Sequence, residues 1–144
     1  TDPAIIVAIV DAQDRILLGS QGVWEQNRWS ILAGFVEPGE SLGAAVIREM
    51  FEESGLVVED PQYLGSQAWP FPHSLMLGFS ARVSDASPSM VADGVEIEKL
   101  RWFSREELGA AAHEMLLPNR ISIARAIIER WYGEELISAT ETGA

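Results

Sequence analysis

The sequence predicts an α/β protein in which a mixed β-sheet lies between helices. Short runs of apolar, often β-branched residues predict strands on both sides of a central helical stretch between Glu40 and Gly55. A second helical stretch near the C-terminus carries an apolar stripe. Strands, helix, strands and helix in this order are typical of a sheet that is covered by helices.

The N-terminal part of the chain predicts three strands. Residues 4–10 read AIIVAIV, a continuous apolar run that is typical of a buried strand. Turn residues 11–14 follow, and residues 15–19 return as a second strand, so the two runs predict a hairpin. After a polar, irregular stretch, residues 29–32 predict a short strand that leads into Gly34.

The stretch from Gly34 to Leu56 has the pattern of a loop followed by a capped helix. Glu40 and Ser41 supply capping chemistry at the start, apolar residues follow at helical spacing, and Gly55 supplies a C-terminal stop. The rest of the chain is organised around this unit.

Three glutamates share one face of this predicted helix. Glu49, Glu52 and Glu53 are spaced i, i+3 and i+4, so their carboxylates lie together and repel one another. One interpretation is a solvated acidic face, which is the usual fate of a charge run. The other is a site for Mg²⁺, Mn²⁺ or Ca²⁺, because carboxylates are hard oxygen ligands and a divalent ion turns their repulsion into coordination.

The second half of the chain predicts further strands and two helices. Residues 57–67 predict a strand that Pro61 interrupts, and residues 75–83 and 97–103 predict two more. A capping box opens a short helix at Ser104.

The last helix is predicted over residues 120–132, with its apolar stripe towards the core. The residues after it are small and polar. We therefore expect a single domain over residues 1–137 and a flexible tail over residues 138–144.

Composition excludes several classes of protein and site. The chain has no cysteine and two histidines, so we expect no disulfide and no zinc in this chain. The net charge of −12 argues against general nucleic-acid binding, because no basic surplus is present to release counterions. No apolar run reaches the roughly 18 residues of a membrane span and no secretory signal is visible, so we expect a cytoplasmic protein without membrane contact.

Residues 66–74, SQAWPFPHS, form a second distinctive segment. The prolines on both sides of Phe71 rigidify an extended chain and fix the aromatic faces of Trp69 and Phe71. Two interpretations are open: the aromatic rings plug the core beside an edge loop, or their faces stack on a planar base or nicotinamide.

The spacing of Gly34, Glu40 and the run REMFEESGL over residues 48–56 resembles the complete Nudix box. The resemblance implies the α/β/α Nudix sandwich and metal-dependent hydrolysis of a nucleoside diphosphate that is linked to another group. It implies that Mg²⁺ or Mn²⁺ binds to the glutamates of the box. It also gives structural roles to Gly34, Glu40, Arg48 and Gly55, with an ion pair between Arg48 and Glu40 that braces the loop against the helix.

Residues 66–74 resemble the SQPWPFPxS signature of the NADH pyrophosphatase subfamily, with Ala68 where the family has proline. This resemblance implies a small-molecule dinucleotide substrate, whose diphosphate bridge is cleaved to release AMP and reduced nicotinamide mononucleotide. The implied metal ligands are Glu49, Glu52, Glu53 and Glu96. The implied catalytic residues are Glu53, Glu52 and Glu49, with Glu53 as the first choice of base. The implied substrate contacts are Phe35, Gln67, Trp69, Phe71, Ser74 and Ala124.

Alternatives stay open at several points. An ordinary loop aromatic also fits Phe35, an ordinary acidic residue at a strand start also fits Glu96, and Lys99 stands where the subfamily often has glutamate. Other diphosphate substrates are ADP-ribose, dinucleoside polyphosphates, modified nucleoside triphosphates and NAD-capped RNA. A module that binds a nucleotide without cleaving it is the alternative from another class. Members of the subfamily usually carry a further domain and a zinc ribbon that contribute to the dimer and the pocket, so a homodimer and a weakly active monomer are both open.

Overall fold

The computed structural model describes residues 1–139 apart from 21–26, 70–72, 93, 95–96 and 98, and the Trp69 side chain and residues 140–144 also lie outside the description. The strands are β1 (Asp2–Val10), β2 (Ile16–Ser20), β3 (Leu32–Phe35), β4 (Val58–Trp69), β5 (Ser74–Val83) and β6 (Lys99–Phe103). The helices are α1 (Leu42–Ser54), α2 (Arg105–Ala111) and α3 (Ile123–Tyr132), with a short 3-10 helix, η1, over Ala112–Glu114. None of the helices in the described part of the chain is long and apolar enough to cross a membrane.

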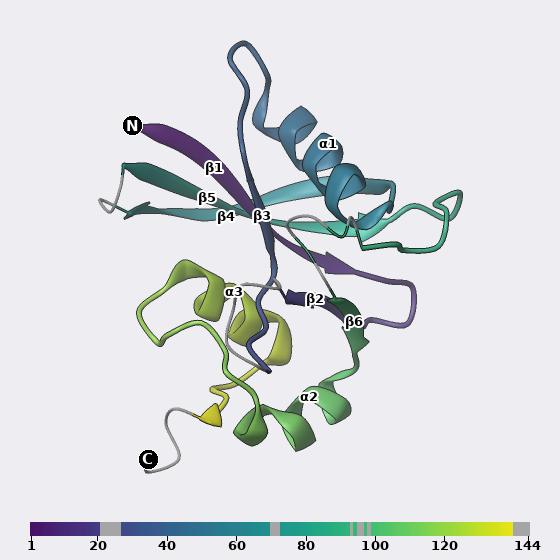
Figure 1. The fold of residues 1–144 in the computed structure, drawn as a ribbon, viewed down its shortest axis with the longest axis vertical. Helices are drawn as coiled ribbons and strands as arrows, with labels where there is room; N and C mark the ends of the chain where they lie inside the picture. Colours follow the sequence, from purple (N-terminus) through teal and green to yellow (C-terminus); the bar gives the residue numbers. More distant parts are fainter. Residues whose placement is uncertain (21–26, 70–72, 93, 95–96, 98, 140–144) are drawn as a thin grey trace.

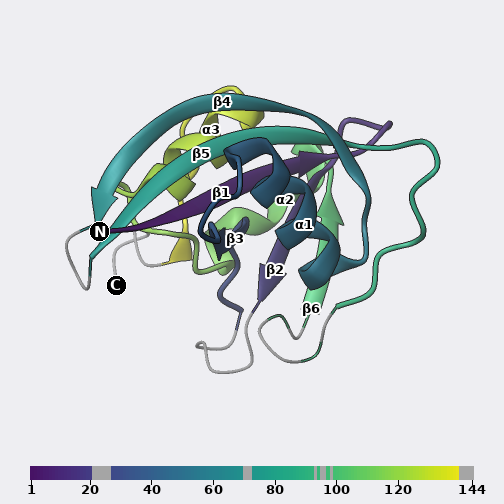
Figure 2. The same cartoon turned by 90° about the horizontal axis from the view of Figure 1, so that it is seen from above.

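The strands form one mixed sheet, as predicted. Along the sheet the order is β4, β5, β1, β2 and β6, and β3 pairs with β1. β1 and β5 are parallel, with Ile5 opposite Leu77, whereas the other pairs are antiparallel. The two longest strands, β4 and β5, run side by side as a curved pair (Figure 2).

β1 separates two apolar clusters, because its side chains alternate between the two faces of the sheet. Its odd-numbered side chains from Ile5 onwards pack in a cluster with Val46 and Met50 of α1. Ile6 points to the other face, in a cluster with Ile128 of α3. Helices therefore cover both faces of the sheet (Figure 1), and the predicted α/β/α sandwich is confirmed.

Two strands differ from the prediction. β3 lies at residues 32–35 rather than 29–32, because those are the residues that pair with β1. β4 runs through Pro61 without a break. The register shifts between Glu59 and Gln62, so the proline sits in a bulge of an edge strand, where its missing N–H is tolerated.

The C-terminal region also differs from the prediction. α3 begins at Ile123 rather than at residue 120. Ser138, which was expected to open a flexible tail, is fully buried, and Ala139 donates its N–H to the Met115 carbonyl. Leu136 packs into the α3-side cluster and holds this segment in place. The tail therefore does not begin at residue 138.

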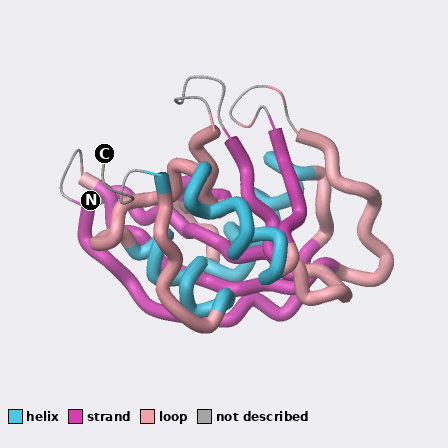
Figure 3. Tube along the Cα trace, turned by 90° about the horizontal axis from the view of Figure 1, so that it is seen from below, coloured by secondary structure: helices cyan, strands magenta, loops and turns pink. Residues whose placement is uncertain are grey.

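The loop after β5 is attached to the end of α1. Gly55 ends α1 in the left-handed conformation, with a φ of 73°, and Val91 donates its N–H to the Ser54 carbonyl at 2.7 Å. Figures 2 and 3 show this loop as a long excursion past the end of the helix. The attachment brings the chain that leads into β6 close to α1.

Candidate active site

α1 presents the three glutamates of the box on a helix whose ends are both fixed. The Ser41 side chain accepts a backbone hydrogen bond of 3.1 Å in the first turn, and Gly55 closes the last turn. Glu53 is 3% exposed, whereas the side chains of Glu49 and Glu52 are 14% and 57% exposed. The exposed fraction of the three glutamate side chains thus increases from Glu53 in the interior to Glu52 at the surface.

Arg48 ties the loop before α1 to the helix. Its Nε and Nη2 donate to the two carboxylate oxygens of Glu40 at 2.6 and 2.8 Å, which is the ion pair expected from the box. Nη2 also donates to the Phe35 carbonyl at 3.1 Å. On the helix, Nη1 donates to Glu49 Oε1 at 2.8 Å and to Glu52 Oε2 at 3.2 Å. One guanidinium therefore positions two predicted metal ligands and the strand end that carries Phe35.

The contact between Arg48 and Glu40 shifts the pKa of both groups. The hydrogen bond from Arg48, and then the N–H of Glu37, lower the pKa of Glu40 to about 2 from its ordinary 4.5. Hydrogen bonds to Glu40 and then to Glu49 raise the pKa of Arg48 above its ordinary range. Both groups therefore stay charged at neutral pH, and the brace is permanent there.

Glycine is needed at position 34 because there is no room for a side chain, and not because of the backbone conformation. A Cβ atom at this position would lie 2.3 Å from the carboxyl carbon of Glu49, and Gly34 is not among the glycines with positive φ. Glycine therefore allows the Glu49 side chain to lie directly against β3.

The predicted substrate contacts Phe35 and Ser74 meet Glu49 in one hollow of about 320 Å³, which we call the Phe35 hollow. Phe35 is 59% exposed, so its ring does not close the core. An exposed aromatic face beside a carboxylate suits a planar group that is attached to a charged one.

Glu53 lines a neighbouring hollow of about 200 Å³, which we call the Glu53 hollow, together with Ser30 and other residues. Ala33 of β3 lines both hollows, so the two adjoin across this strand. The Oε2 atom of Glu53 is buried and accepts no hydrogen bond within the described residues, although the side chain has other interactions. The buried end of the glutamate face therefore borders a cavity rather than packed core alone.

Two predicted substrate contacts lie behind the Phe35 hollow. The Gln67 amide donates to the Ile121 carbonyl and accepts from the Ile123 N–H, both at 2.8 Å, and so joins β4 to the start of α3. Ala124 is buried in the α3-side core, against which Met76 of the hollow also packs. These two hydrogen bonds fix the Gln67 amide and leave it one N–H and one lone pair for a contact with substrate.

Three predicted site residues cannot be placed. The side chain of Trp69, Phe71 and Glu96 lie outside the described residues. Their roles in stacking and metal binding stay predictions.

The donor set of α1 fits a hard divalent ion, because carboxylate oxygens are the ligands that Mg²⁺ and Mn²⁺ prefer. Among the described residues, however, no three acidic or histidine side chains already converge on one point. Glu49 and Glu52 instead turn towards Arg48. Joint binding of one ion requires these two side chains to turn away from the guanidinium.

Met76 is a wall of the Phe35 hollow that the sequence analysis missed. It stands two residues after Ser74 on β5. Because side chains two apart in a strand share a face, the strand period would have placed Met76 beside Ser74. The two-residue alternation of a strand does not indicate which of its two faces borders a cavity.

A hollow larger than the Phe35 and Glu53 hollows lies elsewhere. It has a volume of about 540 Å³ and is bordered by β4, β5 and α3, with Arg82, Arg105 and Trp131 among its walls. None of the predicted site residues lines it. The chemistry of the side chains, rather than the size of a cavity, therefore locates the candidate site.

The chain is similar to known proteins over most of its length. The family described as NUDIX domain matches residues 1–126. The NAD-capped RNA hydrolase NudC of Mycobacterium tuberculosis (strain H37Rv) is 47% identical over 140 residues, which cover 90% of this chain and 44% of that protein. The NAD-capped RNA hydrolase NudC of Stutzerimonas stutzeri is 45% identical over 134 residues, which cover 93% of this chain and 45% of that protein. The chain thus spans less than half the length of these relatives.

Solved structures share the fold. A NUDIX hydrolase from Nitrosomonas europaea has a TM-score of 0.67 at 25% identity and covers 94% of this chain and 91% of its own. A MutT NUDIX hydrolase from Burkholderia pseudomallei has a TM-score of 0.65 at 22% identity, with 92% and 96% covered. The second likeness concerns the fold alone.

Proposed function

The chain belongs to the Nudix family, and from this premise we propose that it is a hydrolase that cleaves the diphosphate bridge of NADH-type dinucleotides. The observation that carries the proposal is the Phe35 hollow, where an exposed aromatic ring and the Glu49 carboxylate line the same space. A dinucleotide offers a planar ring joined to a diphosphate, and these are the two chemistries that such a space receives. The products would be AMP and reduced nicotinamide mononucleotide.

The residues of the Phe35 hollow bind and orient the substrate in this proposal. Phe35 stacks on the planar ring, and the Ser74 hydroxyl offers a hydrogen bond to its polar edge. Arg48 does not touch the substrate. It positions Glu49 and Glu52 through hydrogen bonds that also tie the two to the end of β3.

Glu49, Glu52 and Glu53, together with Glu96 outside the described residues, would hold Mg²⁺ or Mn²⁺. When bound, such an ion supplies positive charge to the diphosphate oxygens of a substrate that meets a protein of net charge −12, and it lowers the pKa of water. The glutamates that the sequence places on one face of α1 are thereby relieved of their mutual repulsion.

Glu53 acts as the general base in this proposal. It lies at the buried end of the glutamate face, beside a hollow that admits water and shields it from bulk solvent. The water oxygen forms a bond to phosphorus while the bridging P–O bond breaks, and Glu53 takes up the proton that the water loses. The leaving phosphate departs with the nucleoside attached to it.

NAD-capped RNA is a second candidate substrate. The relatives that are 47% and 45% identical carry this activity in their names. The cap contains the same diphosphate bridge, and only the 5′ end of the RNA has to enter the site. A net charge of −12 is compatible with this mode, because no long stretch of phosphate backbone needs to be bound. A homodimer and a location in the cytoplasm stay predictions from the sequence.

Product analysis after incubation with NADH tests the proposed function. We expect AMP and reduced nicotinamide mononucleotide to appear in the presence of Mg²⁺ or Mn²⁺ and to disappear when a chelator is added. Glu53→Gln should abolish most of the turnover, whereas the matched control Glu59→Gln, on an exposed position of β4, should not. Metal-dependent cleavage that is equally fast in Glu53→Gln would remove Glu53 from the mechanism. No cleavage of NADH or of NAD-capped RNA by the wild-type chain would refute the function itself.

A further inference from the structure

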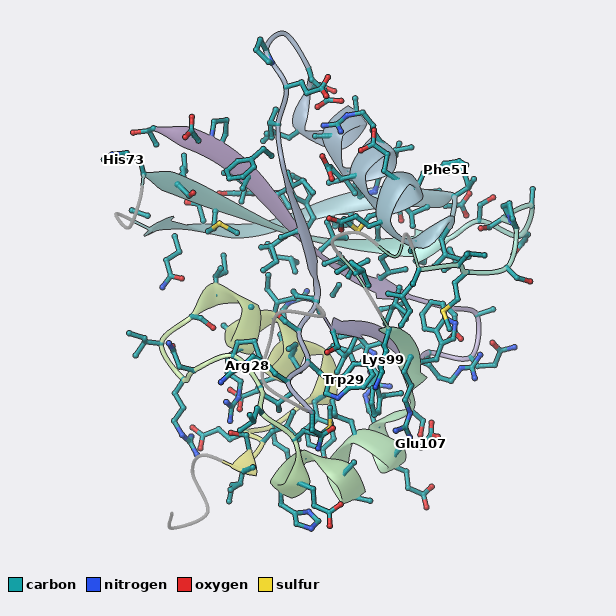
Figure 4. The ribbon with its side chains drawn as sticks, in the orientation of Figure 1. Arg28, Trp29, Phe51, His73, Lys99 and Glu107 are labelled. Atoms are coloured by element: carbon teal, nitrogen blue, oxygen red, sulfur yellow. The ribbon has the colours of Figure 1, made fainter. Side chains whose placement is uncertain are left out.

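A third hollow borders the chain just before the segment that lines the Glu53 and Phe35 hollows. It has a volume of about 430 Å³, and its described walls are Ser20, Asn27, Trp29 and Lys99. Figure 4 labels Trp29 and Lys99, which come from the stretch before β3 and from β6. We call it the Lys99 hollow.

The three hollows follow one segment of chain. The Lys99 hollow borders Asn27 and Trp29, the Glu53 hollow borders residues 30–33, and the Phe35 hollow borders residues 33–35. Figure 1 shows this dark blue segment crossing the molecule from the α1 side towards α2 and α3. Phe35 is six positions after Trp29, so the segment spans at most about 20 Å at roughly 3.3 Å per residue. This is the scale of an extended dinucleotide.

The aromatic wall of the Lys99 hollow is fixed by its neighbours. The indole Nε1 of Trp29 donates to Asn27 Oδ1 at 3.0 Å, and the Asn27 amide in turn donates to the Glu114 carbonyl. The Trp29 ring also meets the edge of Phe103, with ring centroids 5.9 Å apart. A ring held in this way offers a preformed surface to a ligand.

Lys99 is the cation of this hollow. It is exposed and makes no ion pair within the part of the chain that the structure describes. It is also the only lysine in a chain of net charge −12. A lysine ammonium in such surroundings attracts anions, and because it is a compact point charge on a flexible stem it accepts phosphates of varied geometry.

We infer that the Lys99 hollow receives the adenosine ribose of the dinucleotide, with the other ring at Phe35, and that Lys99 binds a phosphate attached to that ribose. The inference rests on the proposed function, because it assumes that the diphosphate lies beside the glutamates of α1. Two kinds of substrate carry such a phosphate. An NADPH-type dinucleotide has a 2′-phosphate monoester, and RNA capped with the dinucleotide has a 3′-phosphodiester.

Binding of product-like nucleotides tests the inference without turnover. The probes are AMP, adenosine 2′,5′-bisphosphate and adenosine 3′,5′-bisphosphate, titrated calorimetrically in Mg²⁺. We expect at least one bisphosphate to bind the wild-type chain about 10-fold more tightly than AMP, which is the scale of one charge-assisted hydrogen bond to phosphate. Lys99→Ala should remove this difference and Lys99→Arg should keep most of it.

Arg82→Ala is the matched control. It removes one positive charge from an exposed position of β5, and Arg82 lines none of the three hollows. The preference for bisphosphate should survive in this variant. An equal loss in Arg82→Ala and Lys99→Ala would show that only net charge matters and would overturn the inference, as would a wild-type chain that binds all three nucleotides equally.

The probes also identify the source of the phosphate. A Lys99-dependent preference for the 2′,5′ compound alone assigns the hollow to NADPH-type substrates, and a preference for the 3′,5′ compound alone assigns it to capped RNA. In turnover, Lys99→Ala should lower kcat/KM for that substrate by about 10-fold relative to kcat/KM for NADH.

The binding assay separates the inference from the proposed function. A Lys99-dependent preference without cleavage of NADH or of NAD-capped RNA would leave the phosphate site standing and refute the function. Cleavage of NADH without any such preference would do the reverse.

Discussion

Within the described residues two charged side chains are buried, Arg125 on α3 and Glu53 on α1. They differ in their surroundings, because Arg125 lies among hydrogen-bond acceptors and Glu53 lines a cavity. Arg125 is 0% exposed. Its guanidinium donates to Glu129 Oε2 at 3.1 Å, to the Pro118 carbonyl at 2.8 Å and to the Leu136 carbonyl at 2.6 Å. The protein itself thus neutralises this charge and satisfies its donors.

Glu53 is buried on a helix that carries two more glutamates of the box. Glu49 and Glu52 stand four and one positions before it on the same helix. The ion pairs that Arg48 forms on this helix go to Glu49 and Glu52. Arg125 thus joins α3 to the segments before and after it, whereas Glu53 lies at a cavity, where a buried carboxylate can meet a ligand.

Glu53→Gln should separate function from stability most strongly. We expect turnover of the proposed substrate to fall by roughly 10²- to 10⁴-fold, the range for loss of a general base. Thermal unfolding without metal should occur at the same temperature or higher, because burying a neutral amide costs less free energy than burying a carboxylate. A variant that unfolds at a clearly lower temperature would place Glu53 with Arg125 among the structural residues.

Arg125→Met should have the opposite profile. Removing the arginine leaves Glu129 with the Leu136 N–H but without its counter-ion, and it takes the guanidinium donors from two backbone carbonyls. Breaking such a buried pair costs about 3–5 kcal/mol. Urea unfolding measures this loss, and kcat per folded molecule should change little. The double variant Arg125→Met, Glu129→Leu should regain part of the stability. Loss below about 1 kcal/mol would show that the buried network contributes little.

Gly34→Ala should disturb the site with a small effect on stability. The new Cβ would meet the Glu49 carboxyl group, which is the end of a flexible side chain and can move away. We expect a loss of activity of about 10-fold, the effect of displacing one ligand, and a change in unfolding free energy below about 1 kcal/mol. A large loss of stability would mean that Gly34 is needed for the backbone of β3 instead.

Glu40→Gln should alter how stability depends on pH. The pKa of Glu40 is about 2 in the folded protein and 4.5 ordinarily, so its contribution is present above pH 4.5 and is lost as the pH falls towards 2. The difference in urea midpoint between wild type and Glu40→Gln should therefore shrink across this window. A difference that stays constant from neutral pH to pH 3 would contradict the brace between Glu40 and Arg48.

Much of the α1 side could be predicted because its signals are local. Ser41 and Gly55 mark the ends of the helix, and the spacing of the glutamates within it places them on one face. The α3 side was predicted less well. Arg125 falls outside the apolar stripe of its helix. Its guanidinium donates to the carbonyl of Leu136, a residue that follows the helix, and this contact cannot be read from the helical spacing.

Contacts between segments that are distant in the sequence also could not be predicted from local sequence patterns. The contact of the Glu49 side chain with Gly34 and the packing of Ser138 against the core depend on how segments meet in space. The hydrogen bonds of Glu49 and Glu52 to Arg48 likewise could not be predicted from spacing alone. Spacing indicates which face a side chain shares, and the neighbours across the fold decide what it contacts.

The dependence of stability on metal shows whether the glutamates of α1 are arranged for a divalent ion. Thermal unfolding of the wild-type chain and of Glu53→Gln would be followed while Mg²⁺ or Mn²⁺ is raised. The account predicts a saturable rise in the wild-type unfolding temperature, corresponding to about 2.7 kcal/mol at 100 times Kd, and little or no rise in the variant. The same rise in both proteins, or none in the wild type, would contradict it.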